Sequence, residues 1–570
     1  MITIEDGDIL IEKDVPITLA DGHIVYCNVF RPNREGKVPP LLSFTPYGKD
    51  SDVAVDFKRY WDFVLRDHPE VVSGQSSGKY LTWEVPDPER WVPDGYAIVV
   101  IDARGTGKSP GFYEMMSPLQ TRELYDAIEW AGMQPWSNGR VGLLGVSYLA
   151  IKQWQVAALQ PPHLAAMIPW EGMFDHYRDF YRHGGIYSSA FLRLLWDSQI
   201  AVNQNGHAGT PYRDRFTGEP STGEPIDPAV LPGNLQNVFE AGQQHPFDDA
   251  YFKARTPVAE RIEVPFLSAG NWGGLGLHLR GNVVAYETAA SPRKWLEMHT
   301  DTHFASMYLE EAVALQKRFF AHFLKGEANG FDEEPPVLLT IRDPRGHYRR
   351  KENEWPLART EWTPMWLDAV EPALSSAAPA KQGEVTFEAL GDGVTFRSPP
   401  FEEDTEFTGP AAAKLFVSSS TTDMDIFLTL RCFDPAGEEV TFVGANDPKA
   451  PVSQGWLRAS HRKLDPQRST PWRPWHPHDR AELLIPGEVT EVDVEIWPTS
   501  IVVPKGYRMA LTVGGRDFER PEATGLMKGS GLFLHADPAD RPPEIFGGTS
   551  TIHSGGPHRS HLLLPRIPAG

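Results

Sequence analysis

The chain has 570 residues, enough at roughly 150 residues each for three or four domains with hydrophobic cores of their own. Its 54 basic and 76 acidic side chains give a net charge of −22, which argues against binding to nucleic acid or to an anionic membrane surface. The two cysteines, Cys27 and Cys432, cannot make a zinc site by themselves. The start of the chain lacks the basic and apolar regions of a signal peptide, and no run of 18 apolar residues predicts a membrane span. We therefore expect a cytoplasmic protein.

Strands and helices alternate in the first half of the chain. Residues 96–102 and 141–146 are apolar and rich in β-branched side chains, which is typical of strands buried on both faces. Residues 120–131, between them, carry apolar side chains at helical spacing. This order predicts a mostly parallel sheet with helices on both faces. Further strands are predicted at 24–30, 41–45, 165–170, 264–269 and 294–298.

Residues 173–257 interrupt this order. They are rich in aromatic residues, punctuated by Gly and Pro, and only partly helical, and they separate two predicted strands by about 90 residues. We interpret them as a cap over the carboxyl edge of the sheet, where such sheets bind ligands.

The last part of the chain has a different pattern. From residue 336 onward helical spacing almost vanishes and short strands recur between turn clusters, beginning with VLLTIR (337–342) and including DIFLTLRCF (425–433). This pattern is typical of an antiparallel sandwich or a jelly roll.

The segment Gly145-Val146-Ser147-Tyr148 is the clearest catalytic signal. It follows a predicted buried strand and precedes a helical run, as a nucleophile elbow does. A serine on such a sharp turn needs a small neighbour, and Gly145 supplies one. The usual G-x-S-x-G pattern has Leu149 at its fifth position here, so a simple N-cap serine is the structural alternative.

Several segments together resemble the cocaine esterase/NonD branch of the X-Pro dipeptidyl-peptidase-like serine hydrolases. They are FTPYGK (44–49), IDARGTGKSPG (101–111), QPWSNGRVGLLGVSYLA (134–150), LRASHRKLD (457–465), SSSTTDMD (418–425) and TSTIHSGGPHRSHLLLP (549–565). The resemblance runs from about residue 15 to the end of the chain. It implies an α/β fold: an α/β-hydrolase core with an inserted helical cap, followed by a C-terminal all-β jelly roll. The corresponding boundaries are 1–172 and 258–335 for the core, 173–257 for the cap and 336–570 for the jelly roll.

The resemblance also implies most of a catalytic site. Ser147 would be the nucleophile, and the Tyr47 hydroxyl and the Tyr148 backbone amide would form the oxyanion hole. The base would be His303, on a short loop after the last strand of the core, whereas His299 ends that strand and fits a supporting role. No metal site and no organic cofactor are implied.

The acid of the triad is where the sequence departs from the family pattern. The family places an Asp in the turn that corresponds to SAGNWGGLGLH (268–278), but the matching position is near Gly273 and the turn has no carboxylate. The best replacement is Glu171, which follows the strand next to the nucleophile strand, in the chain order that α/β-hydrolases allow. Asp301, Asn271 and Trp272 are second-tier candidates, and Asp175 and Asp179 remain open as well.

We therefore expect a serine hydrolase that cleaves a carboxylic ester, lactone or amide of a small molecule through an acyl-enzyme. An X-Pro dipeptidyl-peptidase or α-amino-acid ester hydrolase is the alternative, and cap carboxylates such as Asp197, Asp248 and Asp249 would then bind the substrate ammonium group. A catalytically silent binding protein on the same scaffold is the alternative from another class. The partners expected are a small-molecule substrate but neither nucleic acid nor membrane, with a homo-oligomer such as a dimer left open.

Overall fold

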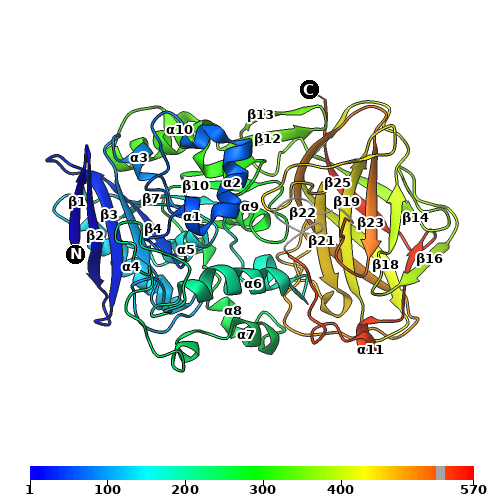
Figure 1. Ribbon diagram of the computed structural model, residues 1–570. Coiled ribbons are helices and arrows are strands. Elements are labelled where there is room, and N and C mark those ends of the chain that lie inside the picture. Colours follow the sequence, from blue (N-terminus) through cyan, green and yellow to red (C-terminus); the bar gives the residue numbers. More distant parts are fainter. Residues whose placement is uncertain (521–532, 570) are drawn as a thin grey trace.

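Two large sheets organise the chain (Figure 1). The computed structural model describes residues 1–520 and 533–569. The first sheet has the strand order β1-β2-β3-β5-β4-β6-β7-β10-β11-β12-β13. Its strands are β1 (Ile2–Asp6), β2 (Ile9–Thr18), β3 (Ile24–Pro32), β4 (Pro40–Thr45), β5 (Ala97–Asp102), β6 (Val141–Val146), β7 (Leu164–Trp170), β10 (Phe266–Asn271), β11 (Lys294–His299), β12 (Val337–Asp343) and β13 (Gly346–Glu352).

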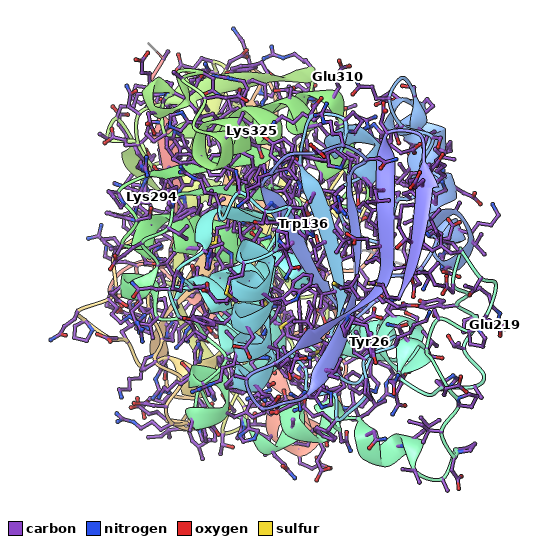
Figure 2. All side chains as sticks on the ribbon, turned by 90° about the vertical axis from the view of Figure 1, so that its left-hand side faces the viewer. Tyr26, Trp136, Glu219, Lys294, Glu310 and Lys325 are labelled. Atoms are coloured by element: carbon purple, nitrogen blue, oxygen red, sulfur yellow. The ribbon has the colours of Figure 1, made fainter. Side chains whose placement is uncertain are left out.

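The centre of this sheet is parallel from β5 to β12, and antiparallel strands extend it at both edges. Every residue of β4, β5, β6 and β10 is buried, so both faces of the sheet are covered, as the apolar runs predicted. Figure 2 views the molecule from the side of the first sheet, with the second sheet behind it. In this view Tyr26 is labelled on β3 and Glu219 on the inserted segment.

Helices connect the parallel strands. The predicted helix at 120–131 is α4 (Pro118–Gly132), and it begins where the Ser117 side chain accepts a hydrogen bond from the amide of Gln120. The helix after the nucleophile motif is α5 (Tyr148–Ala157), whose residues are all buried. The other helices of this half are α1 (Val53–Asp56), α2 (Lys58–Asp67), η1 (Pro69–Val72), α3 (Pro88–Trp91), α9 (Leu279–Thr288), η7 (Ser306–Tyr308), α10 (Glu310–Phe320), η8 (Ala321–Lys325) and η9 (Phe331–Glu333).

A long insertion separates β7 from β10, as expected for a cap. It consists of short helices and one small hairpin rather than long helices. In Figure 1 its helices α6, α7 and α8 lie beside the first sheet and toward the second. Its elements are η2 (Tyr177–Tyr181), β8 (Arg182–His183), β9 (Ile186–Tyr187), α6 (Ala190–Leu195), η3 (Trp196–Ile200), η4 (Ala201–Asn203), η5 (Leu231–Asn234), α7 (Val238–Gln244), α8 (Ala250–Lys253) and η6 (Ala259–Arg261).

The second sheet forms a closed all-β domain around its own apolar core. Its path runs β16-β24-β18-β22-β21-β19-β23-β17-β15-β14-β25, and β25 pairs back onto β18, which closes the ring. Its elements are β14 (Glu361–Asp368), β15 (Ala373–Ser375), β16 (Gly383–Glu388), β17 (Val394–Arg397), β18 (Thr405–Ser419), β19 (Asp425–Phe433), β20 (Glu439–Val440), β21 (Ser453–Arg458), η10 (Ala459–His461), β22 (Thr490–Val503), β23 (Arg508–Gly514), α11 (Pro543–Phe546), β24 (Thr549–Ser554) and β25 (His561–Ile567). Within the described residues, no helix has the length and apolar character that crossing a bilayer requires.

The strand VLLTIR was assigned to the C-terminal β region, and the structure corrects this. It forms β12, which pairs in parallel with β11 in the first sheet, with Leu296 opposite Val337. The reason is the helix α10 between the two strands, since a strand–helix–strand unit brings its second strand back beside the first. The hairpin β12–β13 therefore extends the first sheet as far as Glu352.

Candidate active site

Ser147 lies on a strained turn between β6 and α5. Its backbone has φ 57° and ψ −118°, which non-glycine residues rarely adopt. Its amide donates hydrogen bonds to the carbonyls of Trp170 and Glu171 at 3.1 and 3.2 Å, which hold the turn against the end of β7. A Cβ on Gly145 would lie 2.7 Å from the Cβ of Leu149, so this position needs glycine. The segment thus has the geometry of a nucleophile elbow even though Leu149 departs from the usual pattern.

Two polar side chains contact the Ser147 hydroxyl. The Nε2 atom of His278 lies 3.1 Å from Ser147 Oγ. The Tyr47 hydroxyl also forms a hydrogen bond with Ser147, and burial raises the pKa of Tyr47 well above its usual value. Tyr47 therefore stays protonated and can donate a hydrogen bond inside the pocket.

His303 lies between two carboxylates. Its Nδ1 is 2.8 Å from Glu171 Oε2, and its Nε2 is 3.1 Å from Glu84 Oε1. Burial opposes the charged imidazolium, but the two carboxylates outweigh it and raise the pKa of His303 to about 10. Its backbone amide donates to the carbonyl of Ala445 at 2.9 Å, so the β domain helps to position the loop that carries this histidine.

Glu171 is fully buried at the end of β7, with φ 48°. Besides His303, its carboxylate accepts hydrogen bonds from His299 Nε2 at 2.9 Å and Ser306 Oγ at 2.8 Å. Burial alone would raise the pKa of Glu171, but the two histidines keep it well below its usual value. A buried anion that meets this many donors has the charge and orientation needed to fix an imidazole.

His299 extends this network away from Ser147. Its Nδ1 lies 2.7 Å from Glu297 Oε2, and Arg349 Nη1 lies 2.6 Å from the other oxygen of Glu297. Burial disfavours its charge, but Glu297 and Glu171 raise the pKa of His299 to about 9. This pKa favours the imidazolium form of His299 at neutral pH, in which Nε2 donates a hydrogen bond to Glu171.

The second-tier candidates have other contacts. Asn271 Nδ2 donates to Glu171 Oε1 at 3.4 Å and to the carbonyl of Asp301 at 2.7 Å. Asp301 Oδ1 accepts from the amide of Thr302 and lies 3.1 Å from His68 Nε2, and Trp272 Nε1 donates to the carbonyl of Thr340. The side chain of Asn271 therefore contacts Glu171, whereas the side chains of Asp301 and Trp272 form their hydrogen bonds with residues other than Glu171 and His303.

Most of the candidate carboxylates of the cap form ion pairs with other residues. Asp175 pairs with Arg178 at 2.8 Å, and Asp179 pairs with Arg280 at 2.9 Å. Asp248 also pairs with Arg178, Asp249 caps α8 and contacts His245, and Asp197 is exposed.

The side chain of Tyr148 points away from the nucleophile. Its hydroxyl donates to Gln120 Oε1 at 2.6 Å and accepts from Tyr113 and from the amide of Met116, each at 3.1 Å. Tyr148 is the first residue of α5, and the first amides of a helix have no partner within the helix. Of Tyr148, only the backbone amide is therefore a candidate for the oxyanion hole.

Glu84 and His278 are two further residues of the site that were not predicted from the sequence. Glu84 lies in an irregular segment with φ 62° and follows no motif, so nothing in the sequence marked it. His278 ends the glycine-rich turn that follows β10. A titratable residue in a turn after a central parallel strand is a candidate site residue, and this was the sequence feature that could have identified His278. Both residues line a pocket together with Ser147. The rest of its lining is mostly apolar: Tyr47, Tyr60, Trp83, Phe191, Leu194, Leu195, Gln199, Leu277, His303, Phe304 and Asn446.

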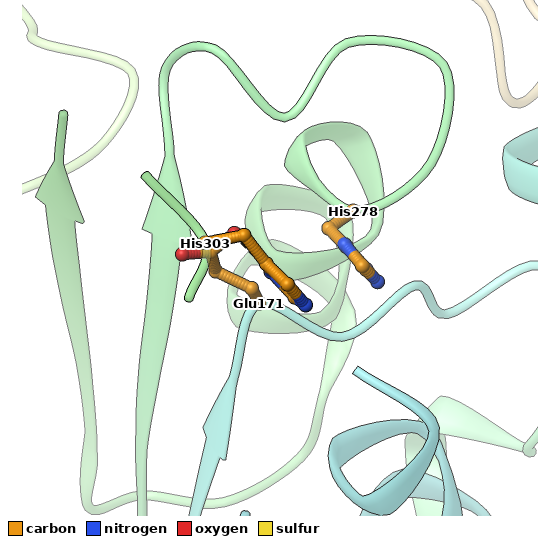
Figure 3. Close-up of side chains that lie close together, drawn as sticks. All are labelled: Glu171, His278 and His303. Atoms are coloured by element: carbon orange, nitrogen blue, oxygen red, sulfur yellow. Dashed lines mark hydrogen bonds and ion pairs between the residues drawn. The ribbon is translucent and has the colours of Figure 1, made fainter. Parts of the chain in front are cut away.

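Figure 3 shows Glu171 at the end of β7, His303 on the loop after β11 and His278 at the start of α9, with the two imidazoles side by side. Their rings lie 5.1 Å apart, with 5° between the ring planes. One ligand atom from each of the three residues lies within 4.8 Å of the others, and two His and one Glu form a set that can hold zinc. The hydrogen bonds of His303 to Glu171 and of His278 to Ser147 already account for this cluster, so we interpret it as a hydrogen-bonded site.

Two family models match the chain. Residues 21–305 match the X-Pro dipeptidyl-peptidase (S15 family) model, and residues 329–563 match the X-Pro dipeptidyl-peptidase C-terminal non-catalytic domain. The cocaine esterase of a Rhodococcus species is 25% identical, over 99% of each chain.

Solved structures are similar over nearly the whole chain. A CocE/NonD family hydrolase from Staphylococcus aureus is 32% identical with a TM-score of 0.85, over 98% of this chain and 94% of that one. An α-amino-acid ester hydrolase shares the fold at 16% identity, with a TM-score of 0.68 over 99% and 98% of the two chains. The chain therefore belongs to the X-Pro dipeptidyl-peptidase (S15) family and, within it, to the CocE/NonD hydrolases.

Proposed function

We propose that this protein is a serine hydrolase that cleaves carboxylic esters of small molecules through an acyl-enzyme intermediate. The observation that carries the proposal is Ser147, held in a strained conformation at the carboxyl end of β6 and facing a pocket that also contains His303 and the Tyr47 hydroxyl. The CocE/NonD hydrolase similarity along nearly the whole chain supports the same chemistry.

In the first half of the reaction, Ser147 Oγ attacks the ester carbonyl and its proton passes to Nε2 of His303. The hydrogen bond between Glu171 and Nδ1 leaves Nε2 as the nitrogen that faces the pocket. In the resting protein Nε2 contacts Glu84, and the pKa of about 10 means that His303 is mostly protonated at neutral pH. His303 must therefore lose this proton and release Glu84 before Nε2 can accept the proton of Ser147. His303 then protonates the leaving alcohol, and in the second half it activates the water that hydrolyses the acyl-enzyme.

The negative charge that develops on the carbonyl oxygen needs donors placed in advance. We assign this role to the Tyr47 hydroxyl and the Tyr148 amide. Each such donor contributes about 3 kcal/mol to transition-state stabilisation in a site shielded from water.

The pocket favours a compact substrate with an apolar acyl or alcohol group. Aromatic side chains form much of its wall, including Trp83, Phe191 and Phe304. Apolar walls with a few placed polar groups are typical of small-molecule sites.

The second candidate is an X-Pro dipeptidyl-peptidase or α-amino-acid ester hydrolase. The family-model match favours it, as does Glu84, whose carboxylate lines the pocket and could accept a hydrogen bond from a substrate ammonium group. Of the cap carboxylates expected for that role, Asp248 pairs with Arg178, Asp249 pairs with His245 and Asp197 is exposed, so Glu84 replaces them in this alternative.

The test compares the wild type with Ser147→Ala on short-chain p-nitrophenyl esters, on amino-acid esters and on X-Pro p-nitroanilides, at pH 7 to 10. Turnover of simple esters that Ser147→Ala abolishes supports the esterase. Turnover restricted to substrates with a free ammonium group supports the second candidate. Absence of all turnover, together with no labelling of Ser147 by a fluorophosphonate, would favour a ligand-binding protein instead.

We also propose that the closed C-terminal domain is a jelly roll. Its support is the mainly antiparallel pairing within one ring and the match to the family's C-terminal non-catalytic domain.

A further inference from the structure

His278 contacts the nucleophile but has no part in the hydrolysis steps assigned to Ser147, His303, Glu171 and Tyr47. It immediately precedes α9, is 1% exposed, and places Nε2 3.1 Å from Ser147 Oγ. In a serine hydrolase whose base is His303, contact between the nucleophile hydroxyl and the imidazole of a different residue needs an explanation.

The surroundings of the ring determine which nitrogen carries its proton. His278 Nδ1 is buried without a hydrogen-bond partner in the described structure. A neutral imidazole has one N–H, and burying that N–H without an acceptor costs more than burying a bare lone pair. The proton therefore belongs on Nε2, where it is donated to Ser147 Oγ.

The same surroundings keep the ring neutral. Burial and the neighbouring His303 lower the pKa of His278 to about 3. The two rings are nearly parallel, so a charged His303 directly opposes a second charge on His278. The position just before α9 acts in the same direction, because the positive end of the helix dipole disfavours a cation there. Burial, the larger of these effects, acts whatever the charge of His303, so His278 is a poor base for the Ser147 proton.

We propose that His278 is a catalytic residue that donates a hydrogen bond from Nε2 to Ser147 Oγ and stabilises the negative charge on that oxygen. This inference rests on the proposed hydrolase function. When Ser147 attacks, its O–H bond breaks, its proton goes to His303 Nε2, and Oγ bonds to the carbonyl carbon. When the acyl-enzyme is hydrolysed, the carbon–Oγ bond breaks and Oγ regains a proton from His303. His278 keeps its own proton throughout, as neutral imidazoles do when they act as hydrogen-bond donors to developing charge.

The test uses two substitutions that differ in one property. His278→Gln retains an N–H near the position of Nε2, whereas His278→Leu fills similar space without a donor. We expect His278→Leu to lower kcat/KM for p-nitrophenyl acetate, and the rate of Ser147 labelling by a fluorophosphonate, on the order of 100-fold. We expect His278→Gln to stay within about 10-fold of the wild type, since one donor is kept.

A matched control removes a different buried imidazole. His461 lies in the β domain against His478 and Gly185, so His461→Leu should leave the labelling rate near that of the wild type. Nitrogen-15 NMR of histidine-labelled wild type, with the His278 signals assigned by loss in His278→Gln, should show a proton on Nε2 and none on Nδ1 from pH 5 to 9.

Three results would overturn the inference. They are full labelling of Ser147 in His278→Leu, a His278→Gln variant as slow as His278→Leu while still folded, and an NMR signal for a proton on Nδ1 or for a charged ring. These differ from failure of the proposed function, in which the wild type itself would neither hydrolyse esters nor react at Ser147.

Discussion

Gly273 of the first sheet's β10 turn packs directly against Gly444 of the β domain. A Cβ added to Gly273 would lie 2.1 Å from the Cα of Gly444, and the amide of Ala445 donates to the Gly273 carbonyl at 3.2 Å. The position where the family pattern expects the triad acid thus has no room for a side chain. Glu171, on the neighbouring strand β7, reaches His303 from the other side, at 2.8 Å.

Replacing Glu171 by Gln should abolish most activity. The amide keeps the size of the carboxylate but loses the charge that stabilises the His303 imidazolium, so we expect kcat to fall about 10³- to 10⁴-fold. Initial rates on p-nitrophenyl esters measure this. Asp301→Asn is the matched control, and it should retain activity within a few-fold. Near-wild-type rates in Glu171→Gln would show that another group orients the base.

Restoring the expected acid at position 273 should damage the protein instead of repairing it. Gly273→Asp forces a side chain into the backbone of the 444–445 loop, and overpacking of this kind costs roughly 1–3 kcal/mol or more of unfolding free energy. Thermal unfolding of Gly273→Asp measures the cost. The activity of the double variant Gly273→Asp/Glu171→Gln tests whether the new carboxylate can replace Glu171. Recovery of activity in this variant would show that position 273 can hold the triad acid.

Removing the Tyr47 hydroxyl should slow the chemical step with little effect on substrate binding. Tyr47→Phe deletes one donor to the oxyanion, and such deletions reduce kcat by about 10²- to 10³-fold. Steady-state kinetics should show the loss in kcat and a nearly constant KM. A change confined to KM would mean that Tyr47 binds the substrate without stabilising the transition state.

The pH dependence of kcat/KM should report on Glu84. Catalysis needs neutral His303, and its pKa of about 10 means that kcat/KM of the free enzyme rises with pH up to the alkaline range. Glu84→Gln removes one of the two negative charges that raise this pKa. The rise should therefore move to lower pH, and the variant should exceed the wild type at pH 7. An unchanged profile would show that Glu84 does not control the protonation of His303.

His299 should link stability to pH. Its pKa is about 9 in the folded protein and about 6.5 when unfolded, so the folded state binds the proton more tightly. Its contribution, up to about 3 kcal/mol, is fully present below pH 6.5 and is lost as the pH rises through 9. Urea unfolding of the wild type and His299→Gln at pH 6 and pH 9.5 tests this. The difference in unfolding free energy between the two proteins should shrink at the higher pH, and a constant difference would contradict it.

The sequence by itself determined the features that local pattern encodes. Buried apolar runs predicted the strands β5 and β6, because a central parallel strand needs apolar side chains on both faces. The segment around Ser147 predicted the elbow, because a strand, a small residue and a helix start are all local signals. The contact between Glu171 and His303 could be predicted because β7 and β11, on either side of β10, are parallel strands of one sheet, and parallel strands end at the same edge of a sheet.

The tertiary structure decided what depends on contacts between distant segments. The 444–445 loop of the β domain excludes a side chain at Gly273, and no local pattern near either glycine announces this contact. His278 and Glu84 reach the site from a glycine-rich turn and an irregular segment, so their proximity to Ser147 and His303 depends on how three loops pack together. The placement of β12 in the first sheet also depends on tertiary structure. The sequence of a strand indicates whether it is buried but not which strand it pairs with. The pairing of β12 with β11 depends on the helix α10, which connects the two strands.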